Sequence, residues 1–149
     1  MEGFTFTELK ENAQQFFILL PEEWQNEIVP FWVTYQSVSK IYAIQNGTSI
    51  IGGGIVFHKA PPHFSYFEKE AETWFNNGYY YLGFIWISEK YRNRSLGSFW
   101  LNQLKNENPQ QRYFLLTEEK HLHHFYLKNG FVCSKTIQNE DHLEWLYHT

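Results

Sequence analysis

Cysteine and basic residues are both scarce in this sequence of 149 residues. A single cysteine, Cys133, excludes an internal disulfide and a zinc site made of several cysteines. No apolar stretch approaches the roughly 20 residues of a membrane span, and the amino end lacks the basic and then apolar pattern of a signal peptide. With 12 basic against 16 acidic residues, the net charge of −4 argues against nucleic acid as a partner. We therefore expect a soluble, cytoplasmic protein that acts away from membranes.

Aromatic residues, in contrast, are abundant. They make up 20% of the chain, with 6 Trp, 10 Tyr and 14 Phe, which predicts a bulky core and allows an aromatic-lined cleft. The length suits one domain with a proper core, and no repeat or low-complexity linker divides it. We therefore expect residues 1–149 to form a single domain.

One stretch, residues 80–98, carries the strongest signal. An almost wholly apolar run from Tyr80 to Ile87 ends at a polar turn with two arginines, Arg92 and Arg94, and a helical pattern follows it. This pattern predicts a buried strand, a turn and a helix amino terminus. Such a turn points several backbone N–H groups at one place, where the helix dipole adds partial positive charge. The stretch thus predicts a site for a phosphate or pyrophosphate.

A hairpin is the clearest β signal elsewhere in the chain. The pair Asn46-Gly47 between two apolar runs predicts this hairpin over residues 40–58. Three consecutive glycines, Gly52–Gly54, predict a bulge or a close backbone approach in its second strand.

The order of the remaining elements defines the fold class. A helix that opens at Pro21 is interrupted at Pro30. The run from strand 80–87 through a helix to the next strand is a βαβ unit, whose two strands are parallel. The other expected elements are a short strand at 4–6, helices over 7–17, 64–75 and 118–128, and strands over 113–117, 131–136 and 142–147. The sequence therefore predicts an α/β (α+β) fold with a mixed central β-sheet flanked by helices.

Two segments resemble motifs of the GNAT superfamily of acetyl-CoA-dependent N-acetyltransferases. Residues 92–97, Arg-Asn-Arg-Ser-Leu-Gly, resemble its Arg/Gln-x-x-Gly-x-Gly/Ala turn, and residues 124–131, His-Phe-Tyr-Leu-Lys-Asn-Gly-Phe, resemble its Phe-Tyr-x-x-x-Gly-Phe segment. Two departures stand out. Ser95 replaces the first glycine, where a left-handed backbone would cost about 1 kcal/mol, and Glu119 replaces an asparagine seven residues before Tyr126.

The resemblance implies transfer of an acetyl group from acetyl-CoA to a primary amine, by direct attack in a ternary complex and without a metal. It assigns the phosphates to the turn and the helix start, the pantetheine arm to the end of the central strand, and the oxyanion to a backbone N–H of that strand. Tyr126 would donate a proton to the leaving thiolate. The cofactor-binding residues so implied are Ile85, Trp86, Ile87, Arg92, Asn93, Arg94, Ser95, Leu96, Gly97 and Ser98.

The residues do not identify the acceptor. Both a small-molecule amine and a protein amine stay open, and edge strands with an aromatic surface are compatible with a homodimer. Segment 59–79 is aromatic and would wall the acceptor site, with the candidates Phe64, Tyr66 and Trp74. The general base stays open between ordered water, His58, His63 and Glu89.

Other interpretations stay open beside this one. The fold could serve a catalytically silent CoA-binding sensor or an interaction module, because Ser95 and Glu119 depart from the cofactor motif. Ser95 also stands in half of a Gly-x-Ser-x-Gly nucleophile elbow, although 149 residues are few for that hydrolase fold. His121 and His124 could share a helix face and bind a metal, although no carboxylate is placed to complete the site.

Two assigned residues also have a purely structural alternative. Gly97 serves either a close approach of phosphate or the packing of its helix. Tyr126 serves either proton donation or the packing of an apolar helix face.

Overall fold

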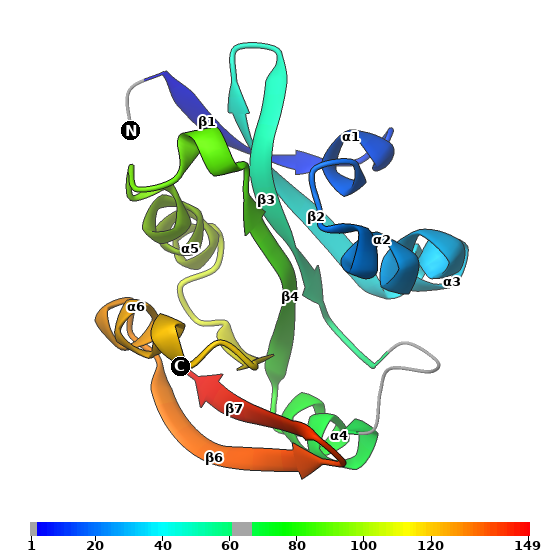
Figure 1. Ribbon diagram of the computed structural model, residues 1–149, viewed down its shortest axis with the longest axis vertical. Helices are drawn as coiled ribbons and strands as arrows, with labels where there is room; N and C mark the ends of the chain where they lie inside the picture. Colours follow the sequence, from blue (N-terminus) through cyan, green and yellow to red (C-terminus); the bar gives the residue numbers. More distant parts are fainter. Residues whose placement is uncertain (1–2, 61–66) are drawn as a thin grey trace.

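A sheet of seven strands runs through the computed structural model, which describes residues 3–60 and 67–149 (Figure 1). The strand order is β1-β2-β3-β4-β5-β7-β6. Neighbouring strands are antiparallel except β4 and β5, which are parallel as the βαβ unit requires. The predicted mixed sheet is therefore confirmed. Its strands are β1 (Phe4–Leu9), β2 (Ser39–Asn46), β3 (Ser49–Phe57), β4 (Tyr79–Ile87), β5 (Arg112–Thr117), β6 (Val132–Asn139) and β7 (His142–His148).

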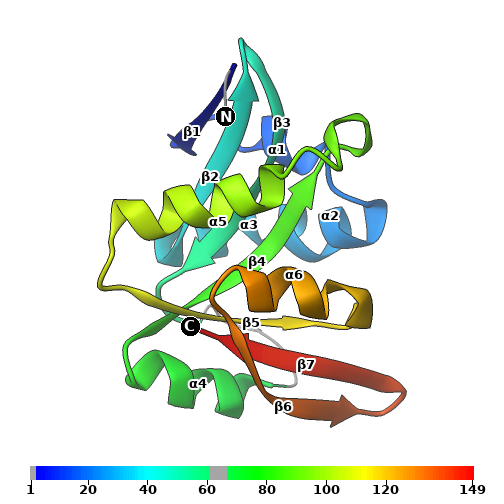
Figure 2. The same cartoon turned by 90° about the vertical axis from the view of Figure 1, so that its left-hand side faces the viewer.

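Helices cover both faces of the sheet. They are α1 (Gln14–Phe17), α2 (Glu22–Ile28), α3 (Trp32–Tyr35), α4 (Glu68–Asn76), α5 (Leu96–Glu107) and α6 (His123–Lys128). Helices α5 and α6 lie on one face, and α1 to α4 lie on the other (Figure 1, Figure 2). Within the described ranges, none of the helices is long and apolar enough to span a membrane.

The two parallel strands at the centre stay together over only part of their length. β4 pairs with β5 from Tyr79–Tyr81 to Arg112–Phe114, and beyond these pairs the two strands diverge (Figure 2). A bulge lies just past the last pair, where the register with β3 shifts between Gly53 and Ile55 and where Phe84 has a φ of 55°. Because a bulge bends its strand, the far end of β4 turns away and has no β5 partner among the described residues.

The glycines of β3 allow α5 to pack closely on the sheet. A Cβ on Gly54 would lie 2.7 Å from the ring of Trp100, and one on Gly53 would clash with the carbonyl oxygen of Tyr42. Trp100 is fully buried, and its indole N–H donates to the same Tyr42 carbonyl at 3.0 Å. Both alternatives predicted for the triple glycine, a bulge and a close approach, are therefore present. This packing sets the position of α5 above the end of β4.

The main core lies between the sheet and the helices α5 and α6. Leu96, Trp100 and Leu104 form the buried face of α5, each at most 2% exposed, as the sequence pattern predicts. A second core lies under α1 to α3, where Phe16 and Phe17 are almost fully buried. The two cores bury opposite faces of the same sheet, so the end of β4 is supported from both sides.

The amino-terminal region departs from its prediction. The helix expected over residues 7–17 is wrong, because Phe4–Leu9 forms the edge strand β1 and only Gln14–Phe17 is helical. Pairing with β2 satisfies the backbone groups of this segment, and the ring of Phe6 stacks on that of Tyr42 at a centroid distance of 5.1 Å. The alternation of the first residues therefore outweighs the helical propensity that follows.

Two other predicted helices have different bounds. α2 ends at Ile28, and a 3-10 turn over Val29–Phe31 carries Pro30, so the predicted interruption is confirmed. The helix expected over 118–128 begins later, because a 3-10 turn over Lys120–Leu122 precedes α6.

Candidate active site

The turn between β4 and α5 has the backbone of an anion site. Asn93 and Ser95 both have left-handed backbones, with φ of 63° and 59°. Ser95 directly precedes α5, and no described side chain caps that helix. The N–H groups of the first turn therefore lack a side-chain acceptor, and the helix dipole favours an anion there.

Ser95 stands in the conformation that the family motif reserves for glycine. Its φ of 59° and ψ of 23° lie in the left-handed region, where a residue with a Cβ is strained by about 1 kcal/mol.

The two arginines of the turn have different surroundings. The Nε of Arg92 donates to the carbonyl oxygen of Ile87 at 2.9 Å, and its guanidinium carbon lies 4.4 Å from the ring centre of Trp86. Arg94 lies 5.4 Å from the ring centre of Tyr91, with no hydrogen bond to another described residue. Arg92 therefore ties the turn to the end of β4, and Arg94 keeps its donors for another partner.

Gly97 and Ser98 lie where α5 meets α6. A Cβ on Gly97 would stand 2.9 Å from the ring of Phe125, so glycine lets the two helices approach. The amide nitrogen of the buried Asn129 donates to the hydroxyl of Ser98 at 3.1 Å and to the carbonyl of Phe125 at 2.8 Å. Both residues therefore have a packing role, and a role in cofactor binding stays a prediction for them.

The end of β4 presents alternate residues to the two faces of the sheet. Ile85 and Ile87 pack against the core under α5, and Trp86 packs on the opposite side, where Trp24 of α2 meets it at 5.4 Å between ring centres. One edge of this segment pairs with β3. The other edge faces the diverging β5, so an extended ligand could add a strand there.

Tyr126 lies in α6 and is only 5% exposed. Its ring packs against Phe131 at 5.7 Å and against Tyr147 at 5.2 Å, measured between ring centres. Burial raises the pKa of Tyr126, and the neighbouring Tyr147 raises it further. Burial also raises the pKa of Tyr81, at the last β4–β5 pair, and Tyr126 adds to that shift. The phenol of Tyr126 is therefore protonated at neutral pH and near the point where the strands separate. Both of its predicted roles, packing and proton donation, are compatible with this position.

Sequence reasoning missed a group of carboxylates near the point where β4 and β5 separate, on the face of the sheet that α2 covers. Desolvation raises the pKa of Glu27 in α2, and the carboxylates of Glu23 and Glu118 raise it further. Desolvation and Glu27 likewise raise the pKa of Glu144 in β7. These side chains come from α2, the end of β5 and β7. The only local signal is that Glu27 follows Trp24 by three residues and so shares its helix face.

The predicted acceptor residues fall in two places. Phe64 and Tyr66 lie outside the described residues. Trp74 packs between Tyr79 and the stacked ring of Phe114, at 4.8 and 5.7 Å between ring centres, and its indole N–H donates to Glu70 at 2.9 Å. This is the start of β4, at the end of the strand opposite the turn, so a contact of Trp74 with the acceptor stays a prediction.

The candidate bases and metal ligands are mostly exposed. Glu89 lies in a 3-10 turn and His58 just after β3, both on the surface, and His63 lies outside the described residues. Glu119 accepts from His121 at 3.3 Å. Within the described ranges, no cluster of three or more His, Cys, Asp or Glu side chains could hold a metal ion.

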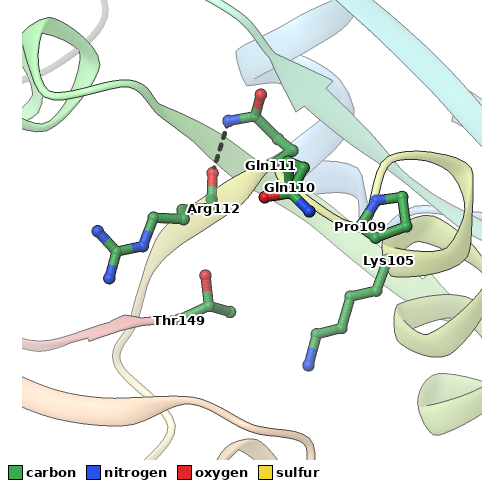
Figure 3. A pocket seen from close by; sticks show the side chains of 6 residues that line it. All are labelled: Lys105, Pro109, Gln110, Gln111, Arg112 and Thr149. Carbon is green, nitrogen blue, oxygen red and sulfur yellow. Dashed lines mark hydrogen bonds between the residues drawn. The ribbon is translucent and has the colours of Figure 1, made fainter.

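A hollow of about 470 Å³ lies beyond the carboxyl end of α5 (Figure 3). Lys105 reaches toward it from α5, but its ammonium donates to the carbonyl oxygen of Asn129. Arg112 lies over the ring of Tyr79 at 5.2 Å, and the amide of Gln111 donates to the Arg112 carbonyl oxygen at 2.8 Å. Because these polar groups already have partners, this hollow is a weaker candidate for a ligand site than the turn.

The described chain thus combines a mixed sheet whose central parallel strands separate with an uncapped helix amino terminus beside the separation. The model of the acetyltransferase (GNAT) family matches residues 6–131, and the chain belongs to this family. It is therefore an acyltransferase. No curated protein matches the chain by sequence.

Solved structures share the fold at low sequence identity. An aminoglycoside 6'-N-acetyltransferase complexed with coenzyme A has a TM-score of 0.71 at 13% identity, over 97% of this chain and 96% of that one. Naa50 of Arabidopsis thaliana, in complex with the bisubstrate analogue CoA-Ac-MVNAL, has a TM-score of 0.68 at 16% identity, over 99% and 98%. A GNAT family acetyltransferase from Elizabethkingia anophelis with acetyl-CoA bound has a TM-score of 0.63 at 15% identity, over 99% and 98%.

Proposed function

We propose that this acetyltransferase moves an acetyl group from acetyl-CoA to a primary amine by direct attack in a ternary complex. The observation that carries the proposal is the separation of β4 from β5 beside the uncapped, left-handed turn before α5. The first feature offers an unpaired strand edge and the second offers backbone N–H groups for an anion. Acetyl-CoA has a chemical counterpart for each.

The diphosphate would lie at the turn, where it would accept from backbone N–H groups around Asn93 and Ser95 and from the guanidinium of Arg94. The pantetheine arm would extend along Ile85, Trp86 and Ile87 as an added strand. Leu96, Gly97 and Ser98 would then form the helix start behind the phosphates, and Arg92 would hold the strand end in place. The complexes with coenzyme A and acetyl-CoA seen for proteins of the same fold support this choice of co-substrate.

In the proposed reaction, Tyr126 would act from the face of the sheet covered by α6 and Glu27 from the face covered by α2. The amine nitrogen attacks the thioester carbonyl carbon, the C–S bond breaks, and the thiolate takes a proton from Tyr126. A backbone N–H at the end of β4 would steady the oxyanion. The ammonium form of the amine has to lose a proton before attack, and Glu27, whose pKa is raised by desolvation, is our candidate to accept it.

The carboxylates beside α2 point to the acceptor class. Glu27 lies within electrostatic reach of both Glu118 and Glu144, and the ring of Trp24, from the same helix as Glu27, packs on that of Trp86. Amines with more than one positive charge would be attracted to this face. We therefore propose a polycationic amine, free or as part of a peptide, as the acceptor.

The test is release of free thiol from acetyl-CoA in the presence of spermidine, an aminoglycoside, a lysine-containing peptide or a monoamine of similar size. We expect amine-dependent release, with the lowest KM for a polycation. Glu27→Gln should raise that KM about tenfold, the equivalent of roughly 1.4 kcal/mol, and should leave the KM of the monoamine unchanged, while kcat falls for every amine because the proposed base is lost. Glu22→Gln, on the exposed first turn of the same helix, is the matched control.

A catalytically silent CoA-binding protein is the second candidate. It is favoured by Ser95 in place of glycine and by Phe125, whose ring already packs on Gly97. Calorimetry with acetyl-CoA distinguishes the two. Binding without thiol release for any amine would support a sensor, and absence of binding would support an interaction module.

A further inference from the structure

A second hollow, of about 500 Å³, lies on the sheet beside the last turn of α5. We name it the α5-end cleft. Its volume is in the range of roughly 300–1,000 Å³ that is typical of small-molecule pockets. Val56 and Leu104, both buried, form an apolar floor. The polar residues that line it are Lys40, Tyr42, His58, Tyr80, Glu107, Asn108, Gln111 and Tyr113.

The α5-end cleft is separate from the proposed acetyl-CoA site. That site lies at the amino end of α5 and at the end of β4, whereas the cleft lies at the carboxyl end of α5 and beside the start of β4. α5 has 12 residues and so spans about 18 Å. Figure 2 shows the helix lying across the sheet with its two ends well apart.

Several polar groups of the cleft have no protein partner, although the amide of Gln111 donates to the carbonyl oxygens of Gly78 and Arg112. Within residues 3–60 and 67–149, the hydroxyls of Tyr42, Tyr80 and Tyr113 make no hydrogen bond and Lys40 and Glu107 make no ion pair. Tyr113 is only 3% exposed, yet no described buried side-chain oxygen is without a partner, so its hydroxyl must reach the cleft. Burial raises the pKa of Tyr113 to about 12, together with Tyr42, Tyr80 and Glu107, and all four residues line the cleft.

The charges of the cleft lie on two sides. Lys40 and His58 come from β2 and β3, where Lys40 is paired with Val56. Burial lowers the pKa of His58, and the positive charges of Lys59 and Lys40 lower it further. Glu107 lies opposite, at the end of α5, and no ion pair joins it to Lys40 in the described chain. A ligand between them would therefore carry both an anionic and a cationic group.

The walls between the charges are aromatic. The rings of Tyr80 and Tyr113 are edge to face at 6.5 Å, and the ring of His58 lies 6.2 Å from that of Tyr80. A ligand ring packs favourably against edges and faces of this kind. The free phenol hydroxyls would also bond to polar groups of the ligand.

We propose that the α5-end cleft binds a free aromatic α-amino acid. Its ring would lie on the apolar floor between Tyr42 and Tyr80, its carboxylate would meet Lys40 and its ammonium would meet Glu107. This site is distinct from the catalytic one and would make the enzyme responsive to a small zwitterion. It does not depend on the acetyl-transfer reaction.

The test is calorimetric titration with L-phenylalanine, with 3-phenylpropanoate, which lacks the ammonium, and with 2-phenylethylamine, which lacks the carboxylate. We expect saturable binding of phenylalanine with a Kd below about 1 mM and weaker binding of both analogues. Lys40→Met should weaken phenylalanine and phenylpropanoate tenfold or more and leave phenylethylamine unchanged. Glu107→Gln should do the reverse.

Two exposed residues of α4, on the other face of the sheet, supply matched controls: Lys69→Met and Glu72→Gln should leave all three ligands unchanged. The phenylalanine titration is repeated with saturating coenzyme A, and the same Kd is expected. No saturable binding of phenylalanine, equal affinities in Lys40→Met and the parent, or competition with coenzyme A would each overturn the proposal. Because binding is read directly, an inactive enzyme would leave the result unaffected.

Discussion

Replacement of Gly97 by alanine separates two reasons for a glycine at the start of α5. The added Cβ would lie 2.9 Å from one ring carbon of Phe125 and 3.2 Å from another, whereas ordinary contact begins at 3.4 Å. The ring therefore has to move by 3.4 − 2.9 = 0.5 Å. Phe125 is flanked by the ring of Tyr126 at 5.1 Å, so its movement disturbs the packing of α6.

The expected effect is a modest loss of stability. Overpacking costs about 1–3 kcal/mol, and the better helical propensity of alanine offsets about 1 kcal/mol of it. Gly97→Ala should therefore lower the free energy of unfolding by about 1 kcal/mol in urea titration. The affinity for coenzyme A should change by less than threefold if packing is the reason for glycine.

A double-mutant cycle with Phe125→Leu makes the test specific. In that background the ring is gone, so Gly97→Ala should become neutral or stabilising, and the two changes should be coupled by about 1 kcal/mol. Asn102→Ala, on the exposed face of the same helix, should stabilise by a few tenths of a kcal/mol through propensity alone. The reasoning fails if the Gly97→Ala variant has the parent's free energy of unfolding but binds coenzyme A tenfold more weakly, and if the same tenfold loss is seen in the Phe125→Leu background. That result would assign the glycine to the approach of phosphate.

Four further substitutions test the turn and the proposed acid. Ser95→Gly should raise the free energy of unfolding by up to about 1 kcal/mol, because it removes left-handed strain; a fall in urea titration would contradict the strain. Tyr126→Phe should lower kcat about 10²-fold with coenzyme A affinity nearly intact, and an unchanged rate would leave Tyr126 a packing residue. Arg92→Met should weaken coenzyme A binding less than Arg94→Met, because Arg92 is already bonded to the strand and stacked on Trp86; equal losses in calorimetry would make Arg92 a direct phosphate ligand.

The parts of the fold that sequence reasoning predicted correctly depend on neighbours in the chain. The strand, turn and helix of residues 80–98 lie next to one another, so the apolar run, the polar turn and the helical spacing could be interpreted together. The left-handed backbone at Ser95 follows from its position in that turn. The prediction for the amino-terminal segment was wrong for the opposite reason. Whether Phe4–Leu9 is a strand depends on its pairing with β2, more than thirty residues away in the chain.

The residues that we propose to contact the acceptor could not be predicted, because they meet only in the folded protein. Trp24 and Glu27 come from α2, Glu118 from the end of β5 and Glu144 from β7, and only packing of α2 on the end of β4 brings them together. The α5-end cleft has the same origin, since Lys40, Glu107 and Tyr113 are joined by strand pairing and by the length of α5. A motif in the sequence thus locates the backbone that we propose to hold acetyl-CoA. The groups that would select a particular acceptor or effector lie on different elements, and they can vary without changing that motif.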